Sequence, residues 1–227
     1  NLDIVSFDAL EFLDKEFTNL NDEKIILDTF YRKGIIKTEI MNGIEFLNHS
    51  LENDKFISSA CLYFYKREFL IKNKLSFLKG VLYEDILYQV EVLLKNPKIK
   101  YIETQFFNRR VRSGSITTKK ITIENIEMMS LVIDKIYNLI ENNYETINNR
   151  TKCNMLSLVK MLYSMLYNYC CQIDGNEVYK KWLMKKYILE SIKKKNRELL
   201  SKSIYIKVKF PRMIQMYRRL KYKYMEK

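Results

Sequence analysis

The sequence is poor in the residues from which the common phosphate-binding loops are built. Its 227 residues include only five glycines and two prolines. Neither GxxxxGKS/T nor GxGxxG occurs, which excludes the glycine-rich loops that hold a nucleotide phosphate through backbone N–H groups. The same scarcity disfavours long structureless linkers.

Histidine and organised cysteine are also scarce. His49 is the single histidine, and no serine lies in a GxSxG motif. A serine hydrolase triad is therefore excluded unless His49 serves it. The four cysteines form neither a CxxC pair nor a regular framework, which is typical of reduced thiols in the cytosol: Cys61, Cys153, Cys170 and Cys171.

No hydrophobic run is long and uniform enough to indicate a membrane span. The most apolar stretch, residues 153–173, is interrupted by Asn154, Lys160, Asn168 and Gln172. It predicts a buried helix. No signal peptide is present, and 47% hydrophobic residues suffice for one large domain or two small ones.

Positive charge is plentiful but confined to one end. The net charge is +13, yet residues 178–227 hold 17 Lys and Arg against 3 Asp and Glu, and residues 1–177 hold 23 against 24. The basic excess therefore belongs to the C-terminal segment, and Lys predominates over Arg.

The hydrophobic patterns predict an α/β fold followed by helices. We expect strands near residues 2–7, 56–65 and 99–107, helices near 44–51 and 83–95, and a polar, Arg-rich loop at 108–116. After residue 120 the periodicity is helical, with helices around 126–144, 155–173 and 178–200. We therefore expect a mixed sheet with flanking helices in residues 1–120 and an all-helical region in residues 121–227.

Two adjacent carboxylates stand out in the stretch GVLYEDILY. Glu84 and Asp85 open the helix expected at 83–95. Acidic residues favour the first turn of a helix because they complement its partial positive charge. The same position can also present a general base at the edge of a pocket, so a capping role and a catalytic role both remain open.

The order of several short motifs resembles one enzyme family. YKREFL (65–70), LSF (75–77), GVLYED (80–85), KYIE (100–103) and FNRRVRSGSI (107–116) follow one another along the chain. This succession resembles the acceptor-side half of family-2 glycosyltransferases with the GT-A fold, of the bacterial capsular and cell-wall polysaccharide type. The resemblance covers about residues 2–120 and fades in the helical region.

The resemblance implies a catalytic role for the acidic pair. Asp85 matches the family's catalytic base, which removes the proton from the acceptor hydroxyl in an inverting sugar transfer. Glu84 would raise the proton affinity of its neighbour or hydrogen-bond to the acceptor sugar.

It also implies a role for the downstream basic stretch. Arg109, Arg110 and Arg112 would stabilise charge on the departing diphosphate, and Ser113 and Ser115 would add hydroxyl donors. A solvated basic loop is the alternative. Arg112 and Ser115 are the residues of this group that we favour most.

The family's nucleotide-binding half has no counterpart in the sequence. Asp3, Asp8 and Asp14 do not form the family's DxD motif. The resemblance therefore implies a fragment that by itself binds neither the divalent metal (Mg or Mn) nor the nucleotide-sugar donor of the full-length enzyme. The expected acceptor is a polysaccharide or a lipid-linked glycan.

The C-terminal segment predicts a basic amphipathic helix. In residues 211–227, Met213, Met216, Tyr217, Leu220 and Tyr224 form an apolar stripe among arginines and lysines. Such a helix can lie on an anionic membrane, or it can dock on the protein with a solvated face. The first interpretation predicts a cytoplasmic protein held at the inner face of the membrane.

A non-enzymatic role is the alternative to a glycosyltransferase. A binding module could grip nucleic acid through its basic segment, but no RNP, KH or recognition-helix pattern is present, so no specific nucleic acid is expected. A degenerate scaffold that has lost catalysis is a third possibility.

Overall fold

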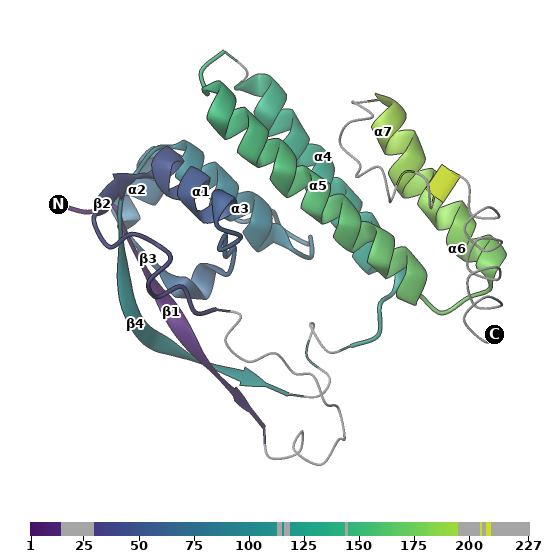
Figure 1. Cartoon of the computed structure of the whole chain (residues 1–227), viewed down its shortest axis with the longest axis horizontal. Helices are drawn as coiled ribbons and strands as arrows, with labels where there is room; N and C mark the ends of the chain where they lie inside the picture. Colours follow the sequence, from purple (N-terminus) through teal and green to yellow (C-terminus); the bar gives the residue numbers. More distant parts are fainter. Residues whose placement is uncertain are drawn as a thin grey trace, which may run out of the picture. The chain divides into compact units, whose positions relative to one another are not determined.

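The computed structural model describes residues 1–14, 30–112, 115, 119–143, 145–194, 205, 208 and 209. The protein is an α/β protein with a four-stranded mixed sheet (Figure 1). The strands are β1 (Ile4–Leu13), β2 (Ile40–Asn42), β3 (Tyr63–Tyr65) and β4 (Lys98–Val111). The helices are α1 (Gly43–Glu52), α2 (Arg67–Lys72), α3 (Glu84–Leu94), α4 (Ile123–Asn142), α5 (Asn149–Gln172), α6 (Glu177–Met184) and α7 (Glu190–Lys194).

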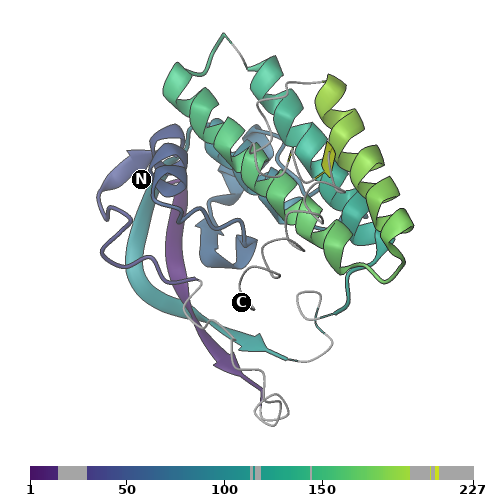
Figure 2. The same ribbon diagram turned by 45° about the vertical axis from the view of Figure 1, so that its right-hand side comes forward.

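The sheet has the order β2-β4-β1-β3, and its two central strands are parallel. β1 pairs with β4 from Ile4↔Ile99 to Leu13↔Val111, whereas β2 and β3 are antiparallel to their neighbours. Because β2 and β3 have three residues each, only one end of the sheet is four strands wide. The other end is a two-stranded ribbon, visible in Figures 1 and 2.

Buried side chains of helices α1 and α3 form a hydrophobic core with the sheet. The buried side chains include Phe46 and Leu47 of α1, Val90 and Leu93 of α3, and Ile99 of β4. α1 contacts both α3 and β4. A Cβ at Gly43 would lie 2.4 Å from Cδ of Pro97, so a residue without a side chain is needed where α1 begins beside the end of α3.

A buried ion pair joins β1 to the segment that precedes β2. Asp8 and Arg32 are fully buried, and Arg32 Nε lies 2.9 Å from Asp8 Oδ1. The backbone N–H of Arg32 and the hydroxyl of Tyr101 both donate to Asp8 Oδ2, over 2.9 and 2.6 Å. Nη2 of Arg32 donates to Ser6 Oγ, so the pair is embedded in a hydrogen-bonded cluster.

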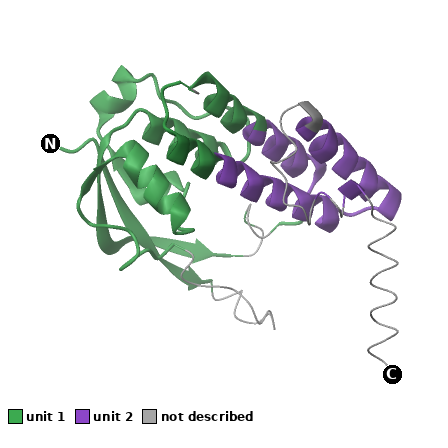
Figure 3. Ribbon diagram, turned by 45° about the horizontal axis from the view of Figure 1, so that its top comes forward, with its two compact units in different colours: residues 1–120, 134–155 green, residues 121–133, 156–227 purple. Residues whose placement is uncertain are grey.

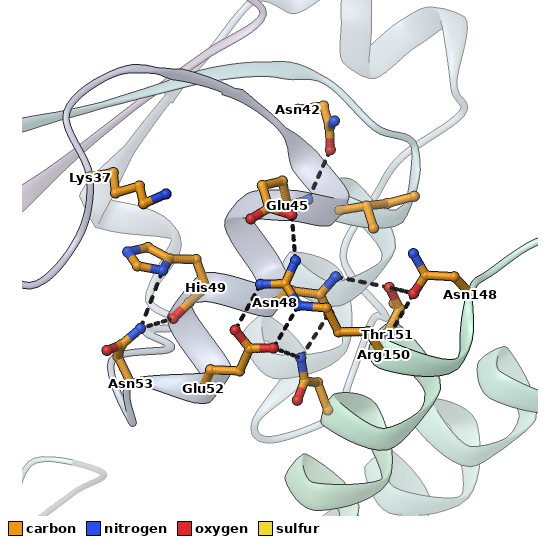
Figure 4. A network of polar contacts seen from close by, with 12 residues as sticks. Lys37, Asn42, Glu45, Asn48, His49, Glu52, Asn53, Asn148, Arg150 and Thr151 are labelled. Carbon is orange, nitrogen blue, oxygen red and sulfur yellow. Dashed lines mark hydrogen bonds and ion pairs between the residues drawn. The ribbon is translucent and has the colours of Figure 1, made fainter.

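A second, exposed network ties the start of α5 to α1. Arg150 donates to Glu45 and to both carboxylate oxygens of Glu52, each over 2.7 Å (Figure 4). The hydrogen bonds from Arg150, and after them the one from Asn154, lower the pKa of Glu52 to about 2. Asn48 of α1 also donates to Thr151 over 2.9 Å. Residues about 100 positions apart are thereby joined.

The chain divides into two compact units (Figure 3). Unit 1 comprises residues 1–120 and 134–155, and unit 2 comprises residues 121–133 and 156–227. Helices α4 and α5 each contribute to both units. The functional division at residue 120 stays a prediction.

The helix expected around 126–144 is confirmed as α4, and Tyr144 at its expected end lies outside the described residues. Ile126, Met129, Ile133, Ile136 and Ile140 are all buried. None of the described helices is long and apolar enough to cross a membrane. The C-terminal helix expected at 211–227 and the end of the one expected at 178–200 lie outside the described residues.

Four expected elements have different bounds in the structure. The strand expected at 56–65 is only Tyr63–Tyr65, preceded by the 3-10 turn Ala60–Leu62. The expected helix after residue 178 is divided by a π-helical turn at Lys185–Leu189. β1 extends through Leu13 and β4 through Val111 because the two strands pair with each other along their whole length. Arg109 and Arg110 therefore lie in a strand, and the prediction of a loop there was wrong.

Candidate active site

The acidic pair is placed at a helix start by a tight turn in the backbone. Gly80 and Tyr83 both have positive φ, 72° and 64°. For tyrosine this conformation costs about 1–2 kcal/mol. Glu84 and Asp85 form the first turn of α3, and the N–H of Ile86 donates to the carbonyl of Tyr83 over 3.1 Å. The prediction of a helix opened by both acids is confirmed.

Asp85 lies in a half-buried environment that favours its protonated form. Burial raises the pKa of the Asp85 carboxyl, and the neighbouring charge of Glu84 raises it further. The N–H of Ile86 and the hydroxyl of Ser58, 3.4 Å from Oδ2, lower this pKa again but do not cancel the effect of burial. The carboxylate of Asp85 consequently holds a proton more tightly than an exposed aspartate does, which suits a general base.

One helical turn beyond Asp85, Gln89 forms a polar pair with the half-buried Tyr65 of β3. Gln89 is fully buried, and its Oε1 accepts a hydrogen bond from the hydroxyl of Tyr65 over 2.7 Å. Its Nε2 has no hydrogen-bond partner among the described residues. Burial, and after it the charges of several neighbours including Asp85, raises the pKa of Tyr65. Tyr65 is thus a neutral donor at physiological pH.

The two acids of the pair do not face the same direction. Successive residues of an α-helix are about 100° apart around its axis, and residues four positions apart share a face. Asp85 shares a face with Gln89 and contacts Ser58. Glu84 shares a face with Leu87, Tyr88 and Glu91 of α3. The geometry therefore gives the two carboxylates different surroundings.

The arginines of β4 are engaged by acidic side chains. Nη1 of Arg109 pairs with Glu11, which lies directly opposite in the β1–β4 register, and its guanidinium lies 4.8 Å from the ring centre of Phe30. Arg110 pairs with Asp14 over 3.5 Å. Because successive side chains of a strand point to opposite faces, Arg109 and Arg110 leave the ribbon on opposite faces.

The remaining residues of the basic stretch follow β4. Arg112 is exposed, and Ser115 is half-buried with its carbonyl accepting the N–H of Lys119 over 2.9 Å. Ser113 lies outside the described residues. No ion pair among the described residues joins Arg109 or Arg110 to Glu84 or Asp85.

Sequence reasoning missed Ser58, which donates to Asp85, and the neighbouring pair of Gln89 and Tyr65. Ser58 comes from the segment after α1 and carries no motif. Gln89 gives a weak signal, because it is a polar residue four positions after Asp85 on a mostly apolar helix. In the sequence, Tyr65 indicates only an aromatic ring that could stack on a sugar, not a hydroxyl that donates to Gln89.

Metal ligation by this part of the chain has no support in the geometry. Residues 1–14, 30–112 and the other described residues contain no cluster of three or more His, Cys, Asp or Glu side chains suited to a metal ion. The described side chains therefore offer no grouping that fits the divalent cation of the glycosyltransferase expectation, and no catalytic step is assigned to one.

Comparison with known proteins gives no further assignment. No family model matches the chain, and no curated protein matches it.

Proposed function

We propose that this chain is the acceptor-activating part of an inverting glycosyltransferase with a truncated GT-A-like half. The enzyme would move a sugar from a nucleotide-sugar donor to a polysaccharide or lipid-linked acceptor. The observation that carries the proposal is the environment of Asp85. It is a half-buried carboxylate with a raised pKa, in the first turn of a helix that follows Tyr83, whose backbone is in the left-handed αL conformation. The motif order from YKREFL to RSGSI supports it.

The reaction requires one proton transfer at Asp85. The carboxylate accepts the proton of the acceptor hydroxyl while that oxygen forms a bond to the anomeric carbon of the donor. The bond from this carbon to the nucleoside diphosphate breaks with its electron pair, and the configuration at the carbon inverts. Burial of Asp85 matches its proton affinity to this task.

We assign a narrower role to the basic stretch than the sequence indicates. Arg109 and Arg110 are held by Glu11 and Asp14, and their ion pairs fix the β1–β4 ribbon. Arg112 and Ser115 are the residues that we assign to the diphosphate. The donor and its divalent cation, Mg or Mn, would be held by residues outside this chain, at the cytoplasmic face of the membrane.

Replacing the base tests the proposal in the enzyme that contains this chain. With a panel of UDP and GDP sugars and polyprenyl-linked glycan acceptors, Asp85→Asn should lower nucleoside diphosphate release at least about 100-fold, since general-base catalysis contributes about 10² to 10⁴. Donor affinity should stay unchanged. Asp54→Asn, an exposed acid outside the site, is the matched control. Turnover by Asp85→Asn equal to that of the control would refute the assignment.

A further inference from the structure

A polar pocket of about 430 Å³ opens beside α3 in unit 1. Three parts of the chain form it: the segment between α2 and α3, the middle of α3, and the C-terminal half of α4. The lining residues are Lys74, Ser76, Phe77, Leu78, Leu87, Tyr88, Glu91, Lys135, Asn138, Leu139 and Asn142. Asp85 is not among them.

An aromatic platform forms part of the pocket wall. The rings of Phe77 and Tyr88 stack with centroids 4.1 Å apart and planes 25° apart. Tyr88 is buried, whereas Phe77 is 44% exposed, so the ring of Phe77 presents surface to a ligand. Partly exposed aromatic rings at a pocket are suited to a ligand with one apolar face.

Polar groups around this platform are available for a ligand. The side chains of Ser76, Asn138 and Asn142 make no hydrogen bond within the described part of the chain. An amide and a hydroxyl can each donate and accept. A ligand with many hydroxyl groups and an apolar ring face, that is a sugar, satisfies both the polar groups and the ring of Phe77.

The charges of the pocket leave a positive excess. Glu91 lies near Lys135, whose charge opposes the effect of burial on the pKa of Glu91. The second lysine of the lining, Lys74, makes no ion pair among the described residues. Residues 69–83 contain Lys72, Lys74 and Lys79 and no acidic residue. A ligand with a negative group is therefore favoured on this side of the pocket.

We infer that the pocket binds a sugar residue that carries a carboxylate or phosphate group. The ring lies against Phe77, the hydroxyl groups meet Ser76 and the asparagines of α4, and the anionic group meets Lys74. Glu84 lies one helical turn before Leu87 and Tyr88 on α3 but is not among the lining residues, so the lining itself holds two lysines and one glutamate. If the chain has the proposed glycosyltransferase function, on which this role rests, the site selects an acidic glycan as the acceptor.

Titration calorimetry on the 227-residue chain tests the inference with three probes. These are trigalacturonate, its neutral methyl ester, and N-acetylglucosamine 6-phosphate, with inorganic phosphate as a reference. The inference requires that at least one charged sugar binds, at least about 10-fold more tightly than the methyl ester and than inorganic phosphate. The two charged probes distinguish a uronate from a sugar phosphate.

Variants locate the binding. Lys74→Gln should weaken binding of the charged probe at least about 10-fold and leave binding of the methyl ester unchanged. Lys72→Gln, in the same basic segment but outside the lining, should leave both unchanged. Phe77→Ala should weaken both kinds of probe. If Phe77→Ala lowers the thermal midpoint, Asn138→Leu is tested in its place. This variant puts an apolar side chain into the pocket wall on α4 and should also weaken both kinds of probe.

Several outcomes would overturn the inference. These are no binding by any charged sugar, equal affinity for trigalacturonate and its ester when the sugar phosphate also fails to bind, and, when trigalacturonate does not bind, inorganic phosphate binding that equals sugar phosphate binding. Binding that is insensitive to Lys74→Gln would do so as well. Because no nucleotide sugar is present, failure here leaves the role of Asp85 intact, and undiminished transfer by Asp85→Asn leaves this binding intact.

Discussion

The environment of Asp85 disfavours the ionised form of its carboxyl group. It is half-buried beside Glu84, and the hydrogen bond that its side chain accepts from Ser58 is 3.4 Å long. A carboxyl with a raised pKa in the folded state binds its proton more tightly there than in the unfolded chain. Its contribution to the free energy of unfolding is therefore favourable at low pH and is lost as pH rises through the folded pKa.

This sign gives a stability test that needs no substrate. Asp85→Asn should raise the thermal midpoint of the 227-residue chain at pH 7, because the ionised carboxylate is removed from a half-buried position. The gain should vanish near pH 3, below the ordinary pKa of 3.8, where both side chains are neutral. Differential scanning calorimetry at several pH values measures it.

The acidic neighbour supplies the control. Glu84→Gln removes the charge that adds to the pKa of Asp85, so the gain from Asp85→Asn should be smaller in the Glu84→Gln background. A gain that is equal at pH 3 and pH 7 would show that ionisation of Asp85 is not its cause.

At the scale of elements, the buried pair Asp8–Arg32 fixes where β1 meets the chain that precedes β2. The β1–β4 register shifts on both sides of Asp8, so the strand is irregular where Asp8 meets Arg32 and Tyr101. Removing one partner of a buried pair leaves the other charge without compensation, which is strongly destabilising.

Arg32→Met should therefore lower the free energy of unfolding by about 3–5 kcal/mol. Arg150→Met is the matched control, because Arg150 is likewise an ion-paired arginine, bound to Glu45 and Glu52, but its side chain is 44% exposed. Its loss should cost about 1 kcal/mol or less for each pair. Urea titration of both variants compares the two values, and equal losses would contradict the assignment of the Asp8–Arg32 pair as the stronger one.

The elements also show what the sequence could predict. Helices α1 and α3 were predictable because α1 has an apolar, buried face and α3 is apolar and buried along most of its length. The end of β4 was not, since Asn108, Arg109 and Arg110 are polar and the ribbon there is held by strand pairing and cross-strand ion pairs. At the site, the acidic pair was visible as a helix start, whereas Ser58 reaches Asp85 only through the tertiary fold.

At the scale of the whole molecule, the basic excess of residues 178–227 is the main feature that the proposed catalytic role does not use. Acidic and basic residues nearly balance over residues 1–177. A cationic amphipathic segment binds anionic lipid through both charge and apolar area. Binding to nucleic acid would instead depend on phosphate contacts and weaken steeply with salt.

Liposome flotation separates these two partners. The 227-residue chain should float with vesicles that contain phosphatidylglycerol and not with neutral phosphatidylcholine vesicles, and a chain that ends at residue 210 should lose most of this binding. Affinity for a random DNA duplex comparable to that for the anionic vesicles would favour the nucleic-acid alternative.

The hydrogen bonds of Arg150 to α1 have a consequence for the order in which the chain folds during synthesis. Unit 1 needs residues 134–155, which are translated after the first 13 residues of unit 2. Before residues 134–155 have been synthesised, Glu45 and Glu52 lack Arg150, the arginine that binds both, and the pocket lacks the wall that α4 provides. A sheet that forms at this stage therefore lacks these partners, and a shortened chain that ends at residue 120 would keep it in that state.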